Sequence, residues 1–265
     1  SGSADVKMVV QRDPCRPDKQ LVFVGKDEIK RTWKGYEIHS SLSLQNPQQH
    51  KDIPLTQPLT AITIIPWAGV IKTTVAVPKF SMQVETQKFD ISPLQVELLT
   101  ERAAEQARVK TLEIRAPQIT MNDEKGRVQL NNSVFKMNQN LNGKGLEAGQ
   151  SSWASEQIHA SLIGTDSASV TFNQFEVKAD TVLHERTVDI LSYLKVGQFS
   201  TGSTRYQNNE YYFDFKDLNR SHLEQYFWLF DQRHQSCAAS KNVDDDLKKA
   251  LLNVFNAGFL LESKN

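Results

Sequence analysis

Cysteine is scarce in this chain, and long apolar runs are missing. The 265 residues include two cysteines, Cys15 and Cys237, and neither belongs to a Cys-x-x-Cys motif. This spacing disfavours a redox dithiol or a zinc ribbon. The longest stretch with an apolar bias, Leu59 to Gly69, contains Pro66 and falls short of the ~18 apolar residues that a membrane-spanning helix needs.

An excess of charge of either sign is also missing. Lysine and arginine total 31, aspartate and glutamate total 31, and the formal net charge is zero. The densest basic run, from Lys26 to Lys34, is interrupted by Asp27 and Glu28 and is typical of a solvated surface segment. A nucleic-acid-binding protein usually carries a basic stripe, so we expect no nucleic-acid partner.

Motifs that carry catalysis are absent from the sequence. The six histidines show no His-x-x-x-His or His-Glu-x-x-His spacing, and no Gly-x-Ser-x-Gly, phosphate-binding or dinucleotide-binding motif occurs. Asp244, Asp245 and Asp246 lack the rest of a calcium loop and suit a helix N-terminus better. We therefore expect no enzyme, no metal and no cofactor, with an enzyme of dispersed active site as a less favoured alternative.

Alternation of apolar and polar residues dominates the region from Ile62 to Phe215. A period of two places alternate side chains on opposite faces of a strand. The alternating apolar pairs are Leu112 and Ile114, Val128 and Leu130, Ile158 and Leu162, Val170 and Phe172, Ile190 and Leu194, and Tyr211, Phe213 and Phe215. The sequence therefore predicts a mainly β (α+β) fold: a long, curved antiparallel sheet with one apolar face.

Several segments depart from this regular pattern. Residues 4–60 contain shorter alternating stretches and are the least regular. Residues 92–109 combine the alternation of a strand with Ser92-Pro93-Leu94-Gln95, which matches a capping box, and we expect a strand leading into a short helix. The apolar parity slips between Leu130 and Phe135 and between Phe172 and Phe175, which predicts β-bulges near Ser133 and Gln174.

Two amphipathic helices are expected at the C-terminal end. Ser221 and Glu224 have capping-box spacing, and Leu223, Tyr226, Phe227 and Phe230 follow as a helical stripe. A second helix is expected from Val243, with Gly258 as its C-cap. We expect both to cover the apolar face, so that residues 4–60 (irregular strands), 61–219 (sheet) and 220–262 (helical segment) form one continuous domain.

Two groups of side chains are candidates for special roles. Aromatic residues cluster near the C-terminal end, and they are interpreted either as sheet-on-helix core or as the wall of an apolar groove. The groove candidates are Tyr206, Tyr211, Phe213, Phe215, Tyr226, Phe227 and Phe230. Cys15 and Cys237 either form a disulfide between the N-terminal loop and the helical region or remain two unpaired thiols.

The stretch from about Lys110 to Asn219 resembles the YdgA family of bacterial envelope proteins. The motifs that carry the resemblance are Asn-Asp-Glu-Lys-Gly at 122–126, Val-Gln-Leu-Asn at 128–131, Ser-Val-Thr-Phe-Asn-Gln-Phe at 169–175, Leu-Ser-Tyr at 191–193, and the helix-forming segment 221–235. The resemblance implies a periplasm-facing protein of unassigned function, held at the inner membrane by an anchor outside this sequence. It implies no catalytic residues.

These observations leave two main hypotheses. The first is a non-catalytic envelope module that binds or scaffolds, holding a lipid or another apolar ligand against the sheet or presenting a strand edge to a partner. The second is a protein-interaction accessory of a secretion or cell-surface assembly, with an envelope protein as its partner. In both, contact with the membrane is expected only through the anchor.

Overall fold

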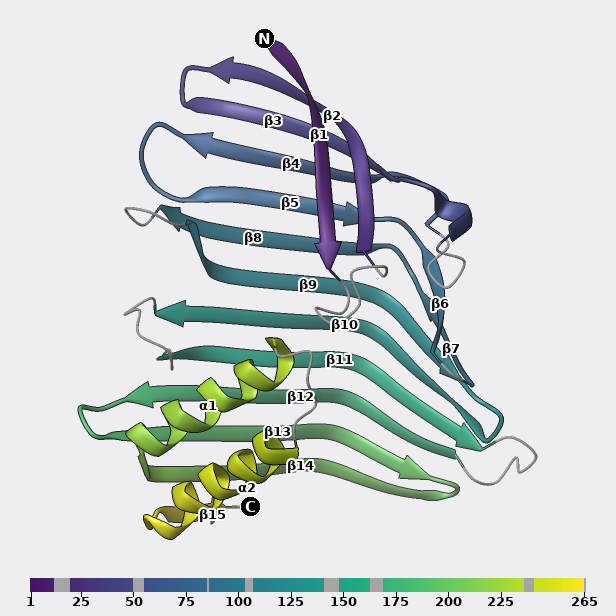
Figure 1. Cartoon of the computed structure of the whole chain (residues 1–265). Coiled ribbons are helices and arrows are strands. Elements are labelled where there is room, and N and C mark those ends of the chain that lie inside the picture. The colour runs from purple at the N-terminus through teal and green to yellow at the C-terminus, as the bar shows by residue number, and fades with distance from the viewer. Residues whose placement is uncertain are drawn as a thin grey trace.

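Strands that follow one another in sequence pair with one another along almost the whole chain (Figure 1). The computed structural model describes residues 1–11, 20–49, 55–84, 86–102, 107–140, 148–162, 169–235 and 241–264. In these residues a fifteen-stranded antiparallel sheet runs in the order β1-β2-β3-β4-β5-β8-β9-β10-β11-β12-β13-β14-β15. The β6–β7 hairpin leaves this path, because β7 pairs with the far end of β9.

The longest strands of the sheet are the six consecutive ones from β9 to β14. The first eight are β1 (Gly2–Gln11), β2 (Gln20–Thr32), β3 (Gly35–Leu44), β4 (Leu59–Pro66), β5 (Ile71–Val77), β6 (Phe80–Val84), β7 (Gln87–Ile91) and β8 (Leu94–Arg102). The others are β9 (Ala107–Asn122), β10 (Gly126–Asn140), β11 (Ala148–Leu162), β12 (Ser169–Leu183), β13 (Thr187–Thr201), β14 (Thr204–Asn219) and β15 (Leu260–Lys264). A 3-10 turn, Pro47–Gln49, lies between β3 and β4. Strands β9 to β14 have 15 or 16 residues each, so each spans roughly 50 Å.

One face of the sheet is apolar from strand to strand. Residues that pair directly on neighbouring strands share a face. One such row, from β5 to β14, consists of Val75, Val96, Ile114, Phe135, Trp153, Val177, Leu194 and Tyr211. We call this side the apolar face and the other side the opposite face. The expected mainly β class, an antiparallel sheet with two C-terminal helices, is confirmed.

The alternation slips by one residue along a single line across β9–β14. Phe172 and Phe175 are an odd number of residues apart, yet both lie on the apolar face, with ring centroids 6.3 Å apart. Neighbouring strands keep the same pairing register on both sides of the line. The alternation therefore shifts by one residue at the same row in every strand. The predicted slips near Ser133 and Gln174 are confirmed. The predicted bulges are wrong, because neither strand carries an extra residue relative to its neighbours.

Left-handed backbone conformations produce this collective slip. Asn132, Gln174 and Asn208 have φ angles of 48°, 53° and 56°, and they occupy the line on alternate strands β10, β12 and β14. Gly197 lies between Gln174 and Asn208, where a Cβ atom would strike the Gln174 side chain. The strands bend along this line in Figure 1.

The apolar face is the inner side of the bend. The side chains on the line point to the opposite face and are exposed: Pro117, Asn132, Glu156, Gln174 and Asn208. The neighbouring apolar-face positions are buried and mostly small: Ala116, Ser133, Ser155 and Val196. The Ser133 hydroxyl donates to Ser155 Oγ at 3.1 Å, and Ser155 Oγ donates to the Asn131 carbonyl at 2.9 Å, so both buried hydroxyls are bonded.

A ladder of side-chain amides crosses the opposite face beside the bend. Gln118 Nε2 donates to Asn131 Oδ1 at 3.4 Å, Asn131 Nδ2 donates to Gln157 Oε1 at 3.2 Å, and Gln157 Nε2 donates to Asn173 Oδ1 at 3.0 Å. Each of these bonds joins residues that pair directly on adjacent strands. The ladder therefore holds the strands in register where the backbone is irregular.

Replacement of Asn132 tests the left-handed line. Asparagine and glycine accept a positive φ, whereas a β-branched residue is strained there. We expect Asn132→Val to lower the free energy of unfolding by about 1–3 kcal/mol and Asn132→Gly to change it by less than about 0.5 kcal/mol. Urea unfolding measures both, and equal stability of the two variants would contradict the assigned backbone.

Two helices follow β14 and pack against each other. They are α1 (Arg220–Gln235) and α2 (Lys241–Asn256). Their contacts with the sheet are concentrated at β13 and β14, although α1 crosses in front of further strands in Figure 1. Buried side chains from both layers form the core there: Val188, Leu218, Leu223 and Val254. A second cluster, Leu21, Phe23 and Leu44, lies at the N-terminal end of the sheet.

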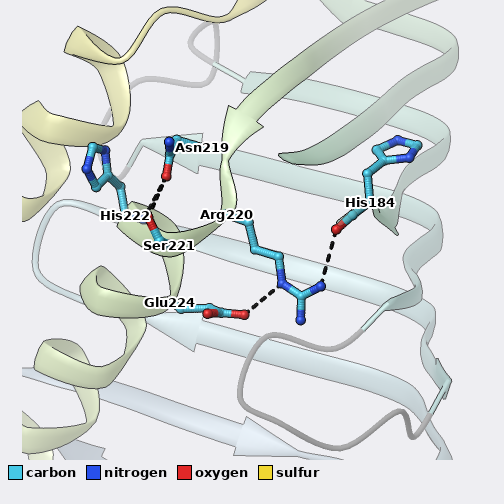
Figure 2. A network of polar contacts seen from close by, with 6 residues as sticks. All are labelled: His184, Asn219, Arg220, Ser221, His222 and Glu224. Atoms are coloured by element: carbon cyan, nitrogen blue, oxygen red, sulfur yellow. Dashed lines mark hydrogen bonds and ion pairs between the residues drawn. The ribbon is translucent and has the colours of Figure 1, made fainter. Parts of the chain in front are cut away.

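Asn219 caps the first helix (Figure 2). Its Oδ1 accepts the His222 N–H at 3.1 Å and the Ser221 hydroxyl at 2.8 Å. Glu224 accepts a hydrogen bond from the side chain of Arg220, Nε–H, at 2.8 Å and not from a capping backbone N–H. Arg220 Nη1 donates to the His184 carbonyl at 3.2 Å. The predicted capping box of Ser221 and Glu224 is therefore wrong. In α2 the C-cap is confirmed, since Gly258 has a φ of 84°.

The Asp189 carboxylate stabilises the start of β13 through contacts with Asp217 and His184. The Asp217 N–H donates to Asp189 Oδ1 at 2.9 Å, and His184 Nε2 lies 3.0 Å from Asp189 Oδ2. The pairing register shifts beside Asp189, between Val188 and Ile190, and Asp217 has a φ of 59°. The backbone hydrogen bond lowers the pKa of Asp189, against a smaller opposing effect of burial, and His184 lowers it further.

This lowered pKa predicts a pH-dependent stability. A carboxylate with a depressed native pKa stabilises the folded state above its ordinary pKa near 3.8, and the effect is lost as the pH falls through the native value. We expect Asp189→Asn to reduce the free energy of unfolding by about 1 kcal/mol at neutral pH and by much less near pH ~2.5. Urea titrations at both pH values measure the difference. An equal loss of unfolding free energy at both pH values would show that the charge of Asp189 does not contribute to stability.

Two further expectations have different outcomes. The helix expected within 92–109 is wrong for the described residues: Leu94–Arg102 is a strand, and Ser92 Oγ accepts the Gln118 N–H at 2.7 Å. Pairing of β8 with both β5 and β9 favours extended backbone over helix-forming composition.

Cys15 and Cys237 lie outside the described residues, so their disulfide stays a prediction. In the described part of the chain, none of the helices has the length and apolarity to cross a membrane.

Candidate functional site

The apolar face continues well beyond the part that the helices cover. A second apolar row lies past the bend and consists of Ile91, Ile119, Leu130, Ile158, Phe172, Phe199 and Tyr206. Its rings contact one another, with centroids 5.0 Å apart for Phe172 and Phe199 and 5.6 Å apart for Phe199 and Tyr206. Trp153 and Phe175 meet at 5.0 Å, so the two rows join across the bend.

Large side chains on this face remain accessible to solvent. Phe135 and Phe213 are 37% and 40% exposed, and Tyr206 is half exposed. A soluble-protein core would bury such rings, and contiguous exposed apolar surface marks a binding or interaction site. The apolar face is therefore the candidate functional site of the chain.

The structure divides the predicted groove residues into two groups. Tyr206, Tyr211, Phe213 and Phe215 lie along β14 on the apolar face, and Phe215 packs beside the helix core, 5.9 Å from the Phe259 ring. We expect the two helices to shield Phe213, but this residue is 40% exposed.

The second group lies on α1, where the rings of Tyr226, Phe227 and Phe230 are neighbours. The Tyr226 ring centroid is 5.6 Å from that of Phe227 and 6.4 Å from that of Phe230. Phe227 and Phe230 are exposed, as is Trp228, and Leu223 is the α1 residue in the buried cluster. The expected stripe therefore anchors to the sheet through its first residue, Leu223, while Phe227 and Phe230 remain exposed.

The opposite face carries charges that pair across strands. Lys72 Nζ lies 2.8 Å from Glu97 Oε2, and Lys195 Nζ lies 3.1 Å from Glu210 Oε1. The hydrogen bond from Lys195 lowers the pKa of Glu210, and burial followed by the charge of Glu210 raises the pKa of Tyr193. At neutral pH the pair is ionised and the Tyr193 phenol is protonated. The two faces thus differ in chemistry as the alternation predicts.

A cleft on the opposite face was not found from the sequence. Its volume is about 630 Å³, and we call it the cross-strand cleft. One row of its lining residues is Lys136, Ser152, Lys178, Tyr193 and Tyr212, and the adjacent row is Thr111, Asn138, Gln150, Asp180, Leu191 and Asp214. Its residues come from six strands, so only the pairing register brings them together. In the described residues, no three histidine, cysteine, aspartate or glutamate side chains gather to hold a metal ion.

Fold and surface together define an open-sheet protein of antiparallel strands with a helical cap at one end and an apolar face left partly open. The chain belongs to a family of bacterial proteins of unknown function (DUF945), whose model matches residues 39–262. No curated protein and no solved structure matches the chain. The family match extends over the sheet from β3 onward and over both helices.

Proposed function

We propose that this chain is a non-catalytic binding module of the bacterial cell envelope that holds the acyl chain of a lipid against its apolar face. The observation that carries the proposal is the partly exposed apolar row from Val75 to Tyr211, which crosses eight strands. Seven spacings of ~4.8 Å make this row about 34 Å long. One acyl chain spans about half of the ~30 Å hydrocarbon thickness of a bilayer, so the row is long enough to hold it.

The side chains along this row suit an acyl chain better than a polar ligand. Each methylene withdrawn from water contributes about 0.8 kcal/mol without any directional contact. Five aliphatic and three aromatic side chains form the row, with Phe135 and Trp153 adjacent at its middle. The apolar face is also the inner side of the bend, which increases the contact that a flexible chain can make.

The envelope assignment is part of the same proposal. It is supported by the bacterial family and by the resemblance of residues 110–219 to YdgA-like proteins. In this proposal the module faces the periplasm and is held at the inner membrane by an anchor outside this sequence.

Native mass spectrometry of the gently purified protein tests lipid binding. We expect a bound mass in the range of a fatty acid or a phospholipid, and saturable uptake of cis-parinaric acid by protein stripped of lipid. Clean protein mass together with no uptake of the fluorescent fatty acid would refute the proposal.

A protein-interaction role is the second candidate, and the outward surface of the helices favours it. Trp228 and Leu252 are 61% and 57% exposed, on α1 and α2. Tryptophan is enriched among the residues that contribute most of the binding energy at protein interfaces. Affinity capture from envelope extracts with the natural protein and with Trp228→Ala distinguishes this role, because a specific partner should be lost with the indole ring.

A further inference from the structure

The cross-strand cleft lies on the face away from the proposed acyl site, and its lining has a different chemistry. Tyr193 and Tyr212 pair on β13 and β14 with ring centroids 5.0 Å apart and ring planes at 48°. Lys178 Nζ lies 5.6 Å from the Tyr193 centroid, on a neighbouring strand. The Tyr212 ring is 40% exposed and is available to a ligand.

Hydrogen-bonding groups of both kinds surround these rings. Gln150 Nε2 donates to Asp180 Oδ2 at 3.2 Å, and the amide and carboxylate retain further donor and acceptor capacity. Asn138, Asp214 and Ser152 add an amide, a carboxylate and a hydroxyl to the same two rows. A ligand that carries many hydroxyl groups, each a donor and an acceptor, matches this mixture.

The charges of the cleft argue against an anionic ligand. Its two lysines already have carboxylate partners, because Lys136 Nζ lies 3.3 Å from Glu113 Oε2 and Lys178 Nζ lies 2.8 Å from Glu176 Oε1. Asp180 and Asp214 balance the two cations within the lining. A phosphate or sulfate group would therefore meet carboxylates as well as lysines, and a neutral ligand is favoured.

The shape of the cleft indicates an elongated ligand. The longer of its two rows runs across β9–β14, over five strand spacings of ~4.8 Å, or about 24 Å. The backbone groups beneath it are already paired within the sheet, so a peptide could not add there as a strand, as it does at a sheet edge. Side chains alone must recognise the ligand.

We propose that the cross-strand cleft binds a neutral, linear oligosaccharide, with the Tyr212 ring stacking on a sugar ring and the amides and carboxylates bonding its hydroxyls. The cleft volume of about 630 Å³ lies within the range of 300–1,000 Å³ that is typical of small-molecule sites. Stacking on an aromatic ring and several hydrogen bonds to hydroxyls are the interactions that the two rows offer. This site is separate from the proposed acyl site and does not depend on it.

Isothermal titration calorimetry of the full chain with chitotetraose, cellotetraose and maltotetraose tests the proposal. We expect at least one tetrasaccharide to bind with a Kd of about 1 mM or tighter. Tyr212→Ala should weaken binding at least about tenfold and Asn138→Ala several-fold, while Tyr212→Phe, which keeps the ring, should retain most of it. Trp33→Ala is the matched control, because this ring is 85% exposed and lies in the turn between β2 and β3, outside the cleft.

Three results would overturn the proposal. They are the absence of saturable binding by all three sugars, affinity unchanged in both Tyr212→Ala and Asn138→Ala, and competition by tetraglycine, which would indicate a peptide site. Asn138 is an exposed residue on the sheet surface, so its variant tests the cleft even if Tyr212→Ala fails to fold.

Discussion

Phe213→Asp is expected to abolish fatty-acid uptake, whereas Tyr212→Asp leaves it unchanged. The two residues are neighbours on β14 and are both 40% exposed, but they point to different faces of the sheet. A carboxylate at Phe213 would have to lose its hydration beneath an acyl chain, which costs several kcal/mol. A loss of affinity of at least about a hundredfold, or ~2.7 kcal/mol, is therefore expected for Phe213→Asp alone.

Titration with cis-parinaric acid measures this difference, and urea unfolding controls for stability. Because both substitutions place the same charge at equal exposure in the same strand, their effects on folding should be similar. Equal loss of uptake in the two variants would mean that the ligand does not distinguish the faces, and the acyl site would then be misplaced.

Leu218→Ala is expected to lower the free energy of unfolding by about 2–5 kcal/mol. Leu218 is 4% exposed and packs with Val188, Leu223 and Val254, so it joins β13 and β14 to both helices. Val188 pairs with Leu218 and is 0% exposed, so it would line the cavity that the substitution leaves.

Leu252→Ala on α2 is the matched control for this core. The side chain is 57% exposed, and its removal should change the free energy of unfolding by less than about 0.5 kcal/mol. Urea unfolding followed by circular dichroism compares the two variants. A loss for Leu252→Ala as large as that for Leu218→Ala would show that the helices are not anchored through the buried cluster.

Much of the sheet was predictable because its signal is local. Leu112 and Ile114 alternate within a single strand, and the turn residues between strands fix an antiparallel order without long-range information. Gly258 as a helix C-cap is local in the same sense, since a positive φ at that position favours glycine.

The features that could not be predicted depend on register or on competition between local signals. The shifts in alternation near Ser133 and Gln174 predict separate bulges when each strand is considered alone. Only the pairing shows that neighbouring strands shift at the same row. Asn219 and Ser221 are both good caps, and the choice between them follows from where β14 ends. Tyr212 lies beside Tyr193 because of the pairing register of β13 and β14, which neither strand reveals alone.

The stripe expected on α1 contacts the sheet over less of its length than expected. Tyr226, Phe227 and Phe230 share a helix face with Leu223, but the contacts of α1 with the sheet are concentrated at β13 and β14, and Phe227 and Phe230 are exposed. Leu223 alone of the α1 side chains joins the buried cluster in the described residues. Aromatic content therefore overstated how fully the helices cover the apolar face.

The most direct measurement is methyl NMR of the protein with bound 16-doxyl-stearate. A spin label held on the apolar face should broaden the methyl signals of Leu130, Val177 and Leu194. The broadening should be clearly weaker for Ile62, Val134 and Leu191, because these methyl groups lie on the opposite face, farther from the label. Equal broadening on both faces, or none on either, would contradict the acyl site.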